Sequence, residues 1–449
     1  MITSPAFRGK RYAVLGLARS GLATVEALVA SGADVTAWDT REEARAAVAD
    51  QAQIADPATI DLVGYDGVVV SPGVPLNRHP IAAHAAQAGV PVIGDIELFA
   101  LARASLPPHK VVGITGTNGK STTTALVHHI LKTAGVPTTM GGNIGLPILA
   151  QDPLPAGGVY VLELSSYQID LTFSLDCDVA VLLNVTRDHL DRYEGFEAYV
   201  ASKLRLFDMQ ASEHDQIVAS HDGIADFPRL IERLPRMSWR DLPTNASDPY
   251  DFWSSFNRAG QIRDVDHLSV QAAWPSLQGS HNAQNASAAV LVAQALSVED
   301  EATDEGLRTY PGLPHRMERV ADKAGILFVN DSKATNPDST APALAAFPHV
   351  HWIVGGLAKG DDLGPCADQL GHVRAAYTIG EAGPMFARLL KGKVPVRESE
   401  LLVTAVHDAA EAASPGEVVL LSPACASFDQ FRDYEARGDA FRAAVEALA

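Results

Sequence analysis

The chain has 449 residues, of which 47% are hydrophobic, and a formal net charge of −19. This length predicts about three domains of roughly 150 residues each, and the charge argues against a general binder of nucleic acid or anionic membranes, which would need clustered lysines and arginines. The three cysteines form no CxxC pair, which excludes a disulfide framework and a thiolate zinc site. With no secretory pattern and no apolar stretch of membrane-spanning length, we expect a cytoplasmic protein without membrane insertion.

Short apolar runs alternate with helical patterns three times along the chain. In the first segment we predict a helix at residues 22–30 and strands at 12–17, 34–38, 67–70 and 90–93. In the second we predict a helix at 120–133 and strands at 110–115, 159–164 and 179–185. The third starts near residue 313, with strands at 326–330, 351–354, 376–379 and 417–421. The stretch 210–278 carries no motif that we can interpret.

This alternation is typical of α/β proteins with mainly parallel sheets and right-handed crossovers. We predict three consecutive Rossmann-like domains, at residues 1–98, 99–312 and 313–449, the central one an ATPase domain with a phosphate-binding loop. In such sheets ligands bind beyond the carboxyl ends of the strands. The informative motifs of this chain follow those strand ends.

The loop after the first predicted strand nearly matches the dinucleotide-binding fingerprint. Its sequence GLARSG, residues 16–21, opens a helix, and Asp39 ends the next strand. Ala18 replaces the middle glycine of the fingerprint, and its methyl group keeps the backbone from approaching a pyrophosphate closely. These residues alone leave three possibilities open: an NAD-dependent oxidoreductase, a site for another phosphate-bearing ligand, and no site.

The strongest motif is GITGTNGKS at residues 113–121, between a predicted strand and a predicted helix. Glycines let backbone N–H groups surround a phosphate, and the new helix directs its positive end toward it. Lys120 can reach the outer phosphates and the Ser121 hydroxyl can bind Mg²⁺. The general pattern has glycine where this chain has Ile114, so the match is to a variant shaped by Gly116 and Gly119. An ordinary glycine-rich connection with an exposed lysine is the alternative, but the motif in this context predicts binding of ATP and magnesium.

Two side chains follow neighbouring strands of the second segment. Glu163 ends an apolar strand and, in a parallel sheet, would face the same crevice as Lys120, where a carboxylate is the usual second anchor for the magnesium of a nucleotide. A solvated strand end is an equally good interpretation of its position. His189 lies in NVTRDH after the next strand, although a lone histidine is more often structural than catalytic.

Together these segments resemble the Mur ligases of peptidoglycan synthesis. The resemblance runs in order from about residue 10 to the C-terminus and rests first on GTNGKST at 116–122, LELSSYQ at 162–168 and NVTRDHLDRY at 184–193. Four further segments narrow it: GGNIGLP at 141–147, GLPHRME at 312–318, NDSKATN at 330–336 and SPACASFDQF at 422–431. They imply the activity that adds D-glutamate to UDP-N-acetylmuramoyl-L-alanine with ATP.

The resemblance implies that the first domain binds the UDP end of the substrate, the second ATP and the third the amino acid. ATP would phosphorylate the L-alanyl carboxylate to an acyl phosphate, which the amine of glutamate attacks. Two Mg²⁺ ions are expected, and the partners would be these two small molecules alone, with the chain a monomer. The first loop would then face uridine diphosphate instead of NAD.

The site residues implied by the resemblance fall into five groups. Those along the UDP substrate are Ser20, Asp39, Arg41, Gly73, Asn143 and His189. Those around ATP are Gly116, Thr117, Asn118, Gly119, Lys120, Ser121, Thr122, Asn282, Asn285, Arg316 and Asp331. Those around the amino acid are Thr335, Lys359, Ser427, Phe428 and Tyr434. The metal ligands are Ser121, Glu163, His189 and Lys203, the lysine as a carbamate, and the catalytic residues are Lys120, His189, Lys203 and Lys333.

Two alternatives remain. A sister Mur ligase or a folylpolyglutamate-type ligase would use another amino acid, but residues 330–336 and 422–431 weigh against it because the C-terminal domain selects the amino acid. A nucleotide-binding oxidoreductase or regulatory module built on the first domain leaves the GTNGKST loop and the third domain without a role. No residue distinguishes D- from L-glutamate.

Overall fold

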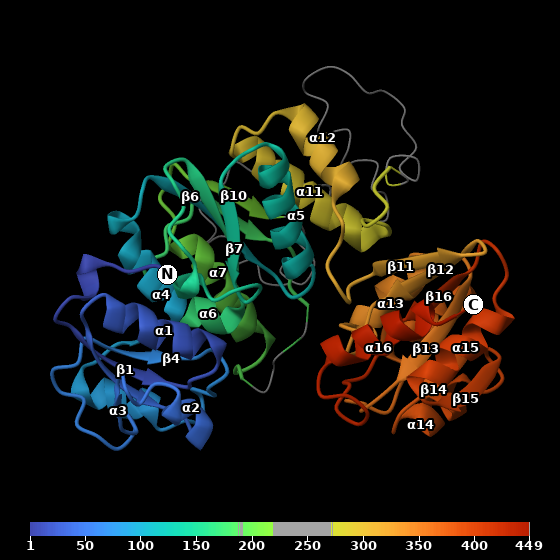
Figure 1. The fold of residues 1–449 in the computed structure, drawn as a ribbon, viewed down its shortest axis with the longest axis horizontal. Coiled ribbons are helices and arrows are strands. Elements are labelled where there is room, and N and C mark those ends of the chain that lie inside the picture. Colours follow the sequence, from blue (N-terminus) through green and yellow to red (C-terminus); the bar gives the residue numbers. More distant parts are fainter. Residues whose placement is uncertain (187, 189–191, 219–270, 272, 449) are drawn as a thin grey trace. The chain divides into compact units, whose positions relative to one another are not determined.

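The computed structural model describes residues 1–186, 188, 192–218, 271 and 273–448. It contains three sheets with flanking helices, coloured blue, cyan to green, and orange to red in Figure 1. The contacts divide the chain into two compact units. One comprises Met1–Ala259 with Asn285–Gly306, and the other Gly260–Gln284 with Leu307–Ala449.

The first sheet has five parallel strands in the order β3-β2-β1-β4-β5. The strands are β1 (Arg11–Leu15), β2 (Asp34–Trp38), β3 (Gln53–Ile54), β4 (Gly67–Val70) and β5 (Val92–Ile93). Its helices are α1 (Arg19–Ala30), α2 (Glu42–Ala46), α3 (Ile81–Ala88) and α4 (Asp95–Ala102). β1 is buried from Tyr12 onward and pairs on both sides, which is why its residues form a continuous apolar run.

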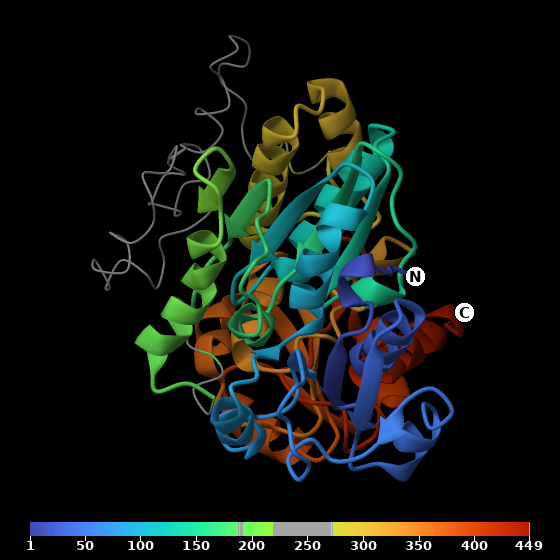
Figure 2. The same ribbon diagram turned by 90° about the vertical axis from the view of Figure 1, so that its left-hand side faces the viewer.

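The second sheet, in the same unit, also has five parallel strands, in the order β10-β9-β6-β8-β7. The strands are β6 (His109–Thr115), β7 (Thr138–Gly142), β8 (Gly158–Glu163), β9 (Val179–Leu182) and β10 (Asp215–Val218). The helices are α5 (Lys120–Thr133), α6 (Ser166–Asp170), α7 (Phe196–Asp208), α11 (Ser280–Ala295) and α12 (Asp300–Thr309). α5 packs on β7 and β8 and α7 on β9 (Figures 1 and 2). One buried apolar cluster runs from Phe7 through Phe99 and Tyr160 to Phe207, so the first two sheets share a core.

The third sheet has six strands in the order β11-β12-β16-β13-β14-β15. The strands are β11 (Glu318–Lys323), β12 (Ile326–Asn330), β13 (Val350–Gly355), β14 (Val373–Ile379), β15 (Val396–Glu400) and β16 (Val418–Leu421). The helices are α13 (Pro337–Ala345), α14 (Gly383–Leu390), α15 (Leu402–Ala412) and α16 (Tyr434–Glu446). Only β11 pairs antiparallel among the strand pairs of the described residues. Short 3₁₀ helices complete the described elements, at Pro5–Phe7, Arg103–Ser105, Ile148–Ala150 and Gly364–His372.

The predicted fold class is confirmed: the chain is α/β with three mainly parallel sheets. The boundaries at residues 98 and 312 fall between successive sheets and stay predictions. The strand predicted at 179–185 ends at Leu182, because Asn184 and Thr186 bond to the phosphate loop instead of to a neighbouring strand. Within the described ranges, no helix has the length and apolarity needed to cross a membrane.

Candidate functional site

The predicted phosphate loop lies between β6 and α5, as the sequence indicates. Gly116 and Gly119 have φ values of +154° and +83°, which only glycine adopts readily, so both are required by the turn. Lys120, Ser121 and Thr122 form the first turn of α5. The helix therefore directs the N–H groups of its first turn and its positive end toward the mouth of the loop, an arrangement that suits an anion.

The end of β9 supports this loop from the side. The N–H of Thr117 donates to the Asn184 carbonyl at 2.9 Å, and the N–H of Asn118 donates to Asn184 Oδ1 at 2.9 Å. The N–H of Thr186 donates in turn to Thr117 Oγ1 at 3.0 Å. Asn184, which the sequence interpretation did not single out, thus holds two consecutive residues of the loop.

Two lysines meet at one carbonyl oxygen beneath the loop. Lys120 Nζ donates to the Gly116 carbonyl at 2.9 Å, and Lys203 Nζ, from α7, donates to the same oxygen at 2.8 Å. Lys203 is 1% exposed and its Nζ lies 4.6 Å from the Tyr199 ring centroid. Burial, and secondly the nearby charge of Lys120, hold the pKa of Lys203 well below its ordinary value. Lys203 therefore favours its neutral amine, while its nitrogen and that of Lys120 converge on one backbone oxygen of the loop.

Glu163 lies at the carboxyl end of β8, beside the loop strand β6. Its Oε1 accepts from Asn143 Nδ2 at 2.9 Å. Its Oε2 is buried and has no hydrogen-bond partner among the described residues. A buried carboxylate oxygen left unpaired is costly, which makes this atom a good candidate ligand for Mg²⁺. Asn143, expected along the UDP substrate, is placed at this carboxylate.

The two asparagines predicted for ATP lie on one helix, α11. Asn285 Oδ1 closes against the loop so tightly that a Cβ on Gly119 would lie 2.2 Å from it. Asn282, in the other unit, is buried and its Nδ2 donates to the Gln278 carbonyl at 3.1 Å.

In the first domain, each carboxylate oxygen of Asp39 accepts a hydrogen bond from a backbone N–H group. Its Oδ2 accepts from the Leu17 N–H at 2.7 Å and its Oδ1 from the Arg41 N–H at 2.9 Å. The hydrogen bond from the exposed Arg41 guanidinium lowers the pKa of Asp39 to about 2, so it stays ionised. Ser20 lines a small cavity at the end of this sheet, and Gly73 is exposed with open space around it.

The other unit collects a second group of predicted residues. Asp331 is buried and accepts from the Met317 N–H at 3.2 Å and the Ser422 hydroxyl at 2.8 Å, and burial raises its pKa to about 7. Lys333 Nζ lies 3.9 Å from the Tyr434 ring centroid. Among the other predicted residues here, Ser427 is buried, Arg316 and Thr335 are half-buried, and Lys359 and Phe428 are exposed. His189 lies outside the described residues.

The site geometry can be compared with known proteins. Three family models match: a Mur ligase MurD-like N-terminal domain at residues 10–94, a Mur ligase middle domain at 114–293 and a Mur ligase glutamate ligase domain at 315–425. The chain belongs to the Mur ligase family.

Curated Mur ligases match the whole chain. A relative from Novosphingobium aromaticivorans is 62% identical over 100% of this chain and 97% of its own, and one from Sphingopyxis alaskensis is 61% identical over 100% of both. Both are named UDP-N-acetylmuramoylalanine–D-glutamate ligase. Among solved structures, the UDP-N-acetylmuramate-alanine ligase of Thermotoga maritima is 17% identical, covers 98% of this chain and 99% of its own, and has a TM-score of 0.57. At that identity it supports the fold alone.

A further residue of this Mur ligase, besides Asn184, escaped the sequence interpretation. Arg437, on α16, is 1% exposed and donates to the Ser332 hydroxyl and carbonyl and to the carbonyls of Cys425 and Ala426. It thereby joins the loop that carries Lys333 to the loop that carries Ser427. Its position three residues after Tyr434 gives no signal of this in the sequence, since a helix arginine is usually exposed.

Proposed function

We propose that this chain is an ATP-dependent ligase that adds D-glutamate to UDP-N-acetylmuramoyl-L-alanine during peptidoglycan synthesis, acting as a cytoplasmic monomer. The observation that carries the proposal is the 62% identity, over the entire chain, to a relative named for that reaction. The loop with its two convergent lysines supports it, because a ligase that consumes ATP needs a site for the nucleotide's phosphates.

The chemistry requires activation of a carboxylate, which is a poor electrophile at neutral pH. A carboxylate oxygen of the L-alanyl group attacks the γ-phosphorus of ATP, and ADP leaves. The amine of glutamate then attacks the acyl carbon, phosphate departs, and an amide remains. Lys120 lowers the repulsion between the two anions of the first step, since its ammonium lies at the phosphate loop.

Magnesium fits the residues beside the loop. Ser121 in the first turn of α5 and Oε2 of Glu163, which lacks a hydrogen-bond partner in the described part of the chain, would hold one ion, which would neutralise charge on the phosphates. The proposed second ion would use His189 and a carbamylated Lys203. The depressed pKa of Lys203 favours its neutral amine, whose nitrogen can attack carbon dioxide and release a proton to give the carbamate anion.

The other proposed contacts are distributed over both units. Ser20, Asp39, Arg41 and Gly73 would face the UDP group, with Asn143 and His189 nearer the reacting end. Asn282, Asn285, Arg316 and Asp331 would bind ATP together with the loop. Thr335, Lys359, Ser427, Phe428 and Tyr434 would surround the amino acid, with Lys333 beside the reacting groups. The cations among them suit a substrate with two carboxylates.

The test is release of phosphate from ATP by the purified protein with magnesium and UDP-N-acetylmuramoyl-L-alanine, with D-glutamate, L-glutamate and other amino acids added in turn. We expect release that depends on D-glutamate, with a product heavier by one glutamate residue, and none from Lys120→Ala. Release with a different amino acid alone would keep the ligase and replace its substrate. No release with any amino acid would contradict the proposal.

A further inference from the structure

The turn that carries Arg316 has an unfavourable backbone. The residues on both sides, His315 and Met317, have φ values of +63° and +47°, in the left-handed region that side chains disfavour. The turn closes with the N–H of Arg316 donating to the Leu313 carbonyl at 3.2 Å. Such a conformation persists only where its surroundings hold it.

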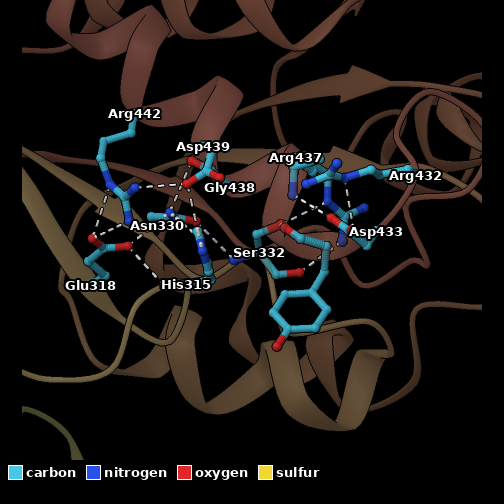
Figure 3. Close-up of polar contacts among 12 residues, drawn as sticks. His315, Glu318, Asn330, Ser332, Arg432, Asp433, Arg437, Gly438, Asp439 and Arg442 are labelled. Atoms are coloured by element: carbon cyan, nitrogen blue, oxygen red, sulfur yellow. Dashed lines mark hydrogen bonds and ion pairs between the residues drawn. The ribbon is translucent and has the colours of Figure 1, made fainter. Parts of the chain in front are cut away.

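We call five residues the His315 cluster: His315, its three neighbours Glu318, Asn330 and Gly438, and Arg442, which reaches the histidine through Glu318 (Figure 3). The N–H of His315 donates to Glu318 Oε2 at 2.9 Å. Asn330 Nδ2 lies 3.1 Å from His315 Nδ1, 3.0 Å from Glu318 Oε2 and 3.2 Å from the Gly438 carbonyl. Arg442 Nη2 donates to Glu318 Oε1 at 2.7 Å, so the carboxylate joins the turn to α16.

Gly438 lets α16 approach the histidine. A Cβ at this position would lie 2.1 Å from His315 Nδ1 and 2.9 Å from its Cγ and Cε1. The glycine lies inside a helix, where alanine is the more favourable residue. Close contact with the imidazole, which is part of a side chain only 8% exposed, therefore explains the glycine better than backbone freedom does.

The same turn is bonded to two other residues of the proposed site. The N–H of Met317 donates to Asp331 Oδ1 at 3.2 Å, and the N–H of Lys333 donates to the His315 carbonyl at 3.0 Å. A displacement of His315 would thus be passed on to Asp331 and Lys333 as well as to Arg316.

We propose that the His315 cluster is a positioning device: through Gly438 and the Glu318–Arg442 ion pair, α16 sets the conformation of the turn that presents Arg316 to the phosphates of ATP. The inference rests on the proposed function for the role of Arg316. It assigns to the C-terminal helix an effect on nucleotide binding, although none of the cluster residues needs to touch the nucleotide.

The test compares Gly438→Ala with Gly371→Ala, a matched control in the same unit. Gly371 has open space around it and its backbone is not left-handed, so the added methyl group meets nothing. We measure the dissociation constant of a non-hydrolysable ATP analogue by calorimetry, and KM for ATP and for D-glutamate by phosphate release. Gly438→Ala should weaken analogue binding and raise KM for ATP by about tenfold, with KM for D-glutamate changing less than about threefold.

Equal analogue affinity in Gly438→Ala and Gly371→Ala would overturn the proposal. So would a loss of affinity for ATP and D-glutamate alike that followed a fall in melting temperature, because this would indicate a structural role only. Absence of D-glutamate-dependent release in the unchanged protein would contradict the proposed function, whereas the analogue affinities would still decide the role of the cluster.

A second pair of variants covers the case in which Gly438→Ala fails to fold. Arg442→Gln removes the ion pair with Glu318 near the surface, together with the one to Asp439, and should weaken analogue binding by about threefold. Arg442→Lys keeps a cation at this position and should bind the analogue as the unchanged protein does. Equal affinities of the two Arg442 variants for the analogue would contradict a positioning role of the His315 cluster.

Discussion

At the scale of single residues, Lys203 differs most from what its sequence suggests. Without the family resemblance it would be interpreted as a solvated helix lysine. The structure buries it under the phosphate loop, where its ammonium donates to the Gly116 carbonyl and its pKa is depressed by burial. A lysine in this environment readily becomes a neutral nucleophile, which is what carbamate formation requires.

Lys203→Ala tests this role directly. We expect activity to fall by about a hundredfold or more, because the proposed second metal loses an anionic ligand. Acetate or formate should restore part of it by placing a carboxylate in the vacated space. Lys132→Ala, the same change at an exposed position of α5, should leave phosphate release unaffected. Full activity of Lys203→Ala, or no rescue by either acid, would exclude the carbamate.

Asp331 predicts a dependence of stability on pH. Burial raises its pKa from 3.8 to about 7, so between these values the folded chain holds a proton that the unfolded chain has released. The contribution of the Asp331 carboxyl to the free energy of unfolding is therefore fully present below pH 3.8. It is lost as the pH rises through about 7, the pKa of Asp331 in the folded chain.

Asp331→Asn keeps an acceptor for the Met317 N–H and removes the titration. At about pH 8 the free energy of unfolding of this variant should exceed that of the unchanged protein by up to about 4 kcal/mol. The difference between the two free energies of unfolding should be smaller at about pH 5. Denaturant unfolding at both pH values measures this difference. A difference that does not change with pH would show that the Asp331 carboxyl does not titrate in this way.

At the scale of elements, the loop between β6 and α5 combines a special backbone with close packing. Gly119 precedes α5 and Gly135 follows it, and both have positive φ, +83° and +73°. A Cβ on Gly119 would collide with Asn285 Oδ1, whereas Gly135 has open space. The two positions therefore separate backbone strain from crowding of the proposed nucleotide site.

Substitution of both glycines by alanine tests this difference. Gly135→Ala should cost about 1–2 kcal/mol of stability from its left-handed backbone and leave ATP affinity unchanged. Gly119→Ala should carry similar strain and in addition displace Asn285, weakening ATP binding by about a hundredfold or more. Calorimetric titration with ATP, together with thermal unfolding, distinguishes the two effects. Similar ATP affinities in both variants would show that contact with Asn285 does not determine the conformation of the loop.

The described strands that the sequence did not predict are all at sheet edges. β3, β7, β10, β11 and β15 each form an edge, and β7 and β15, with the sequences TTMGG and VRESE, lack a long apolar run. Central strands such as β6 and β16 are buried on both faces and were predicted to within about one residue, because burial requires continuous apolar residues.

At the scale of the whole molecule, the proposed ATP residues are divided between two compact units: the loop and Asn285 lie in one, and Arg316 and Asp331 in the other. A reaction that needs both sets requires the units to come together around the nucleotide. We expect the radius of gyration from small-angle scattering to decrease when a non-hydrolysable ATP analogue and the UDP substrate are both added. Lys120→Ala should show a smaller change at the same ligand concentrations, and an unchanged profile of the wild-type chain would contradict closure.

The sequence by itself determined the α/β class, the positions of the central strands, the glycine-rich loop before α5 and the family, because these depend on local patterns: apolar runs, a glycine-rich turn and long motifs. Tertiary structure alone showed that Lys203 shares the Gly116 carbonyl with Lys120, that Asn143 bonds Glu163 and that Arg437 joins two loops. It also showed why Gly438 faces His315. These contacts join residues far apart in the chain, and burial, which sets their pKa values and their roles, is a property of packing that no local pattern contains.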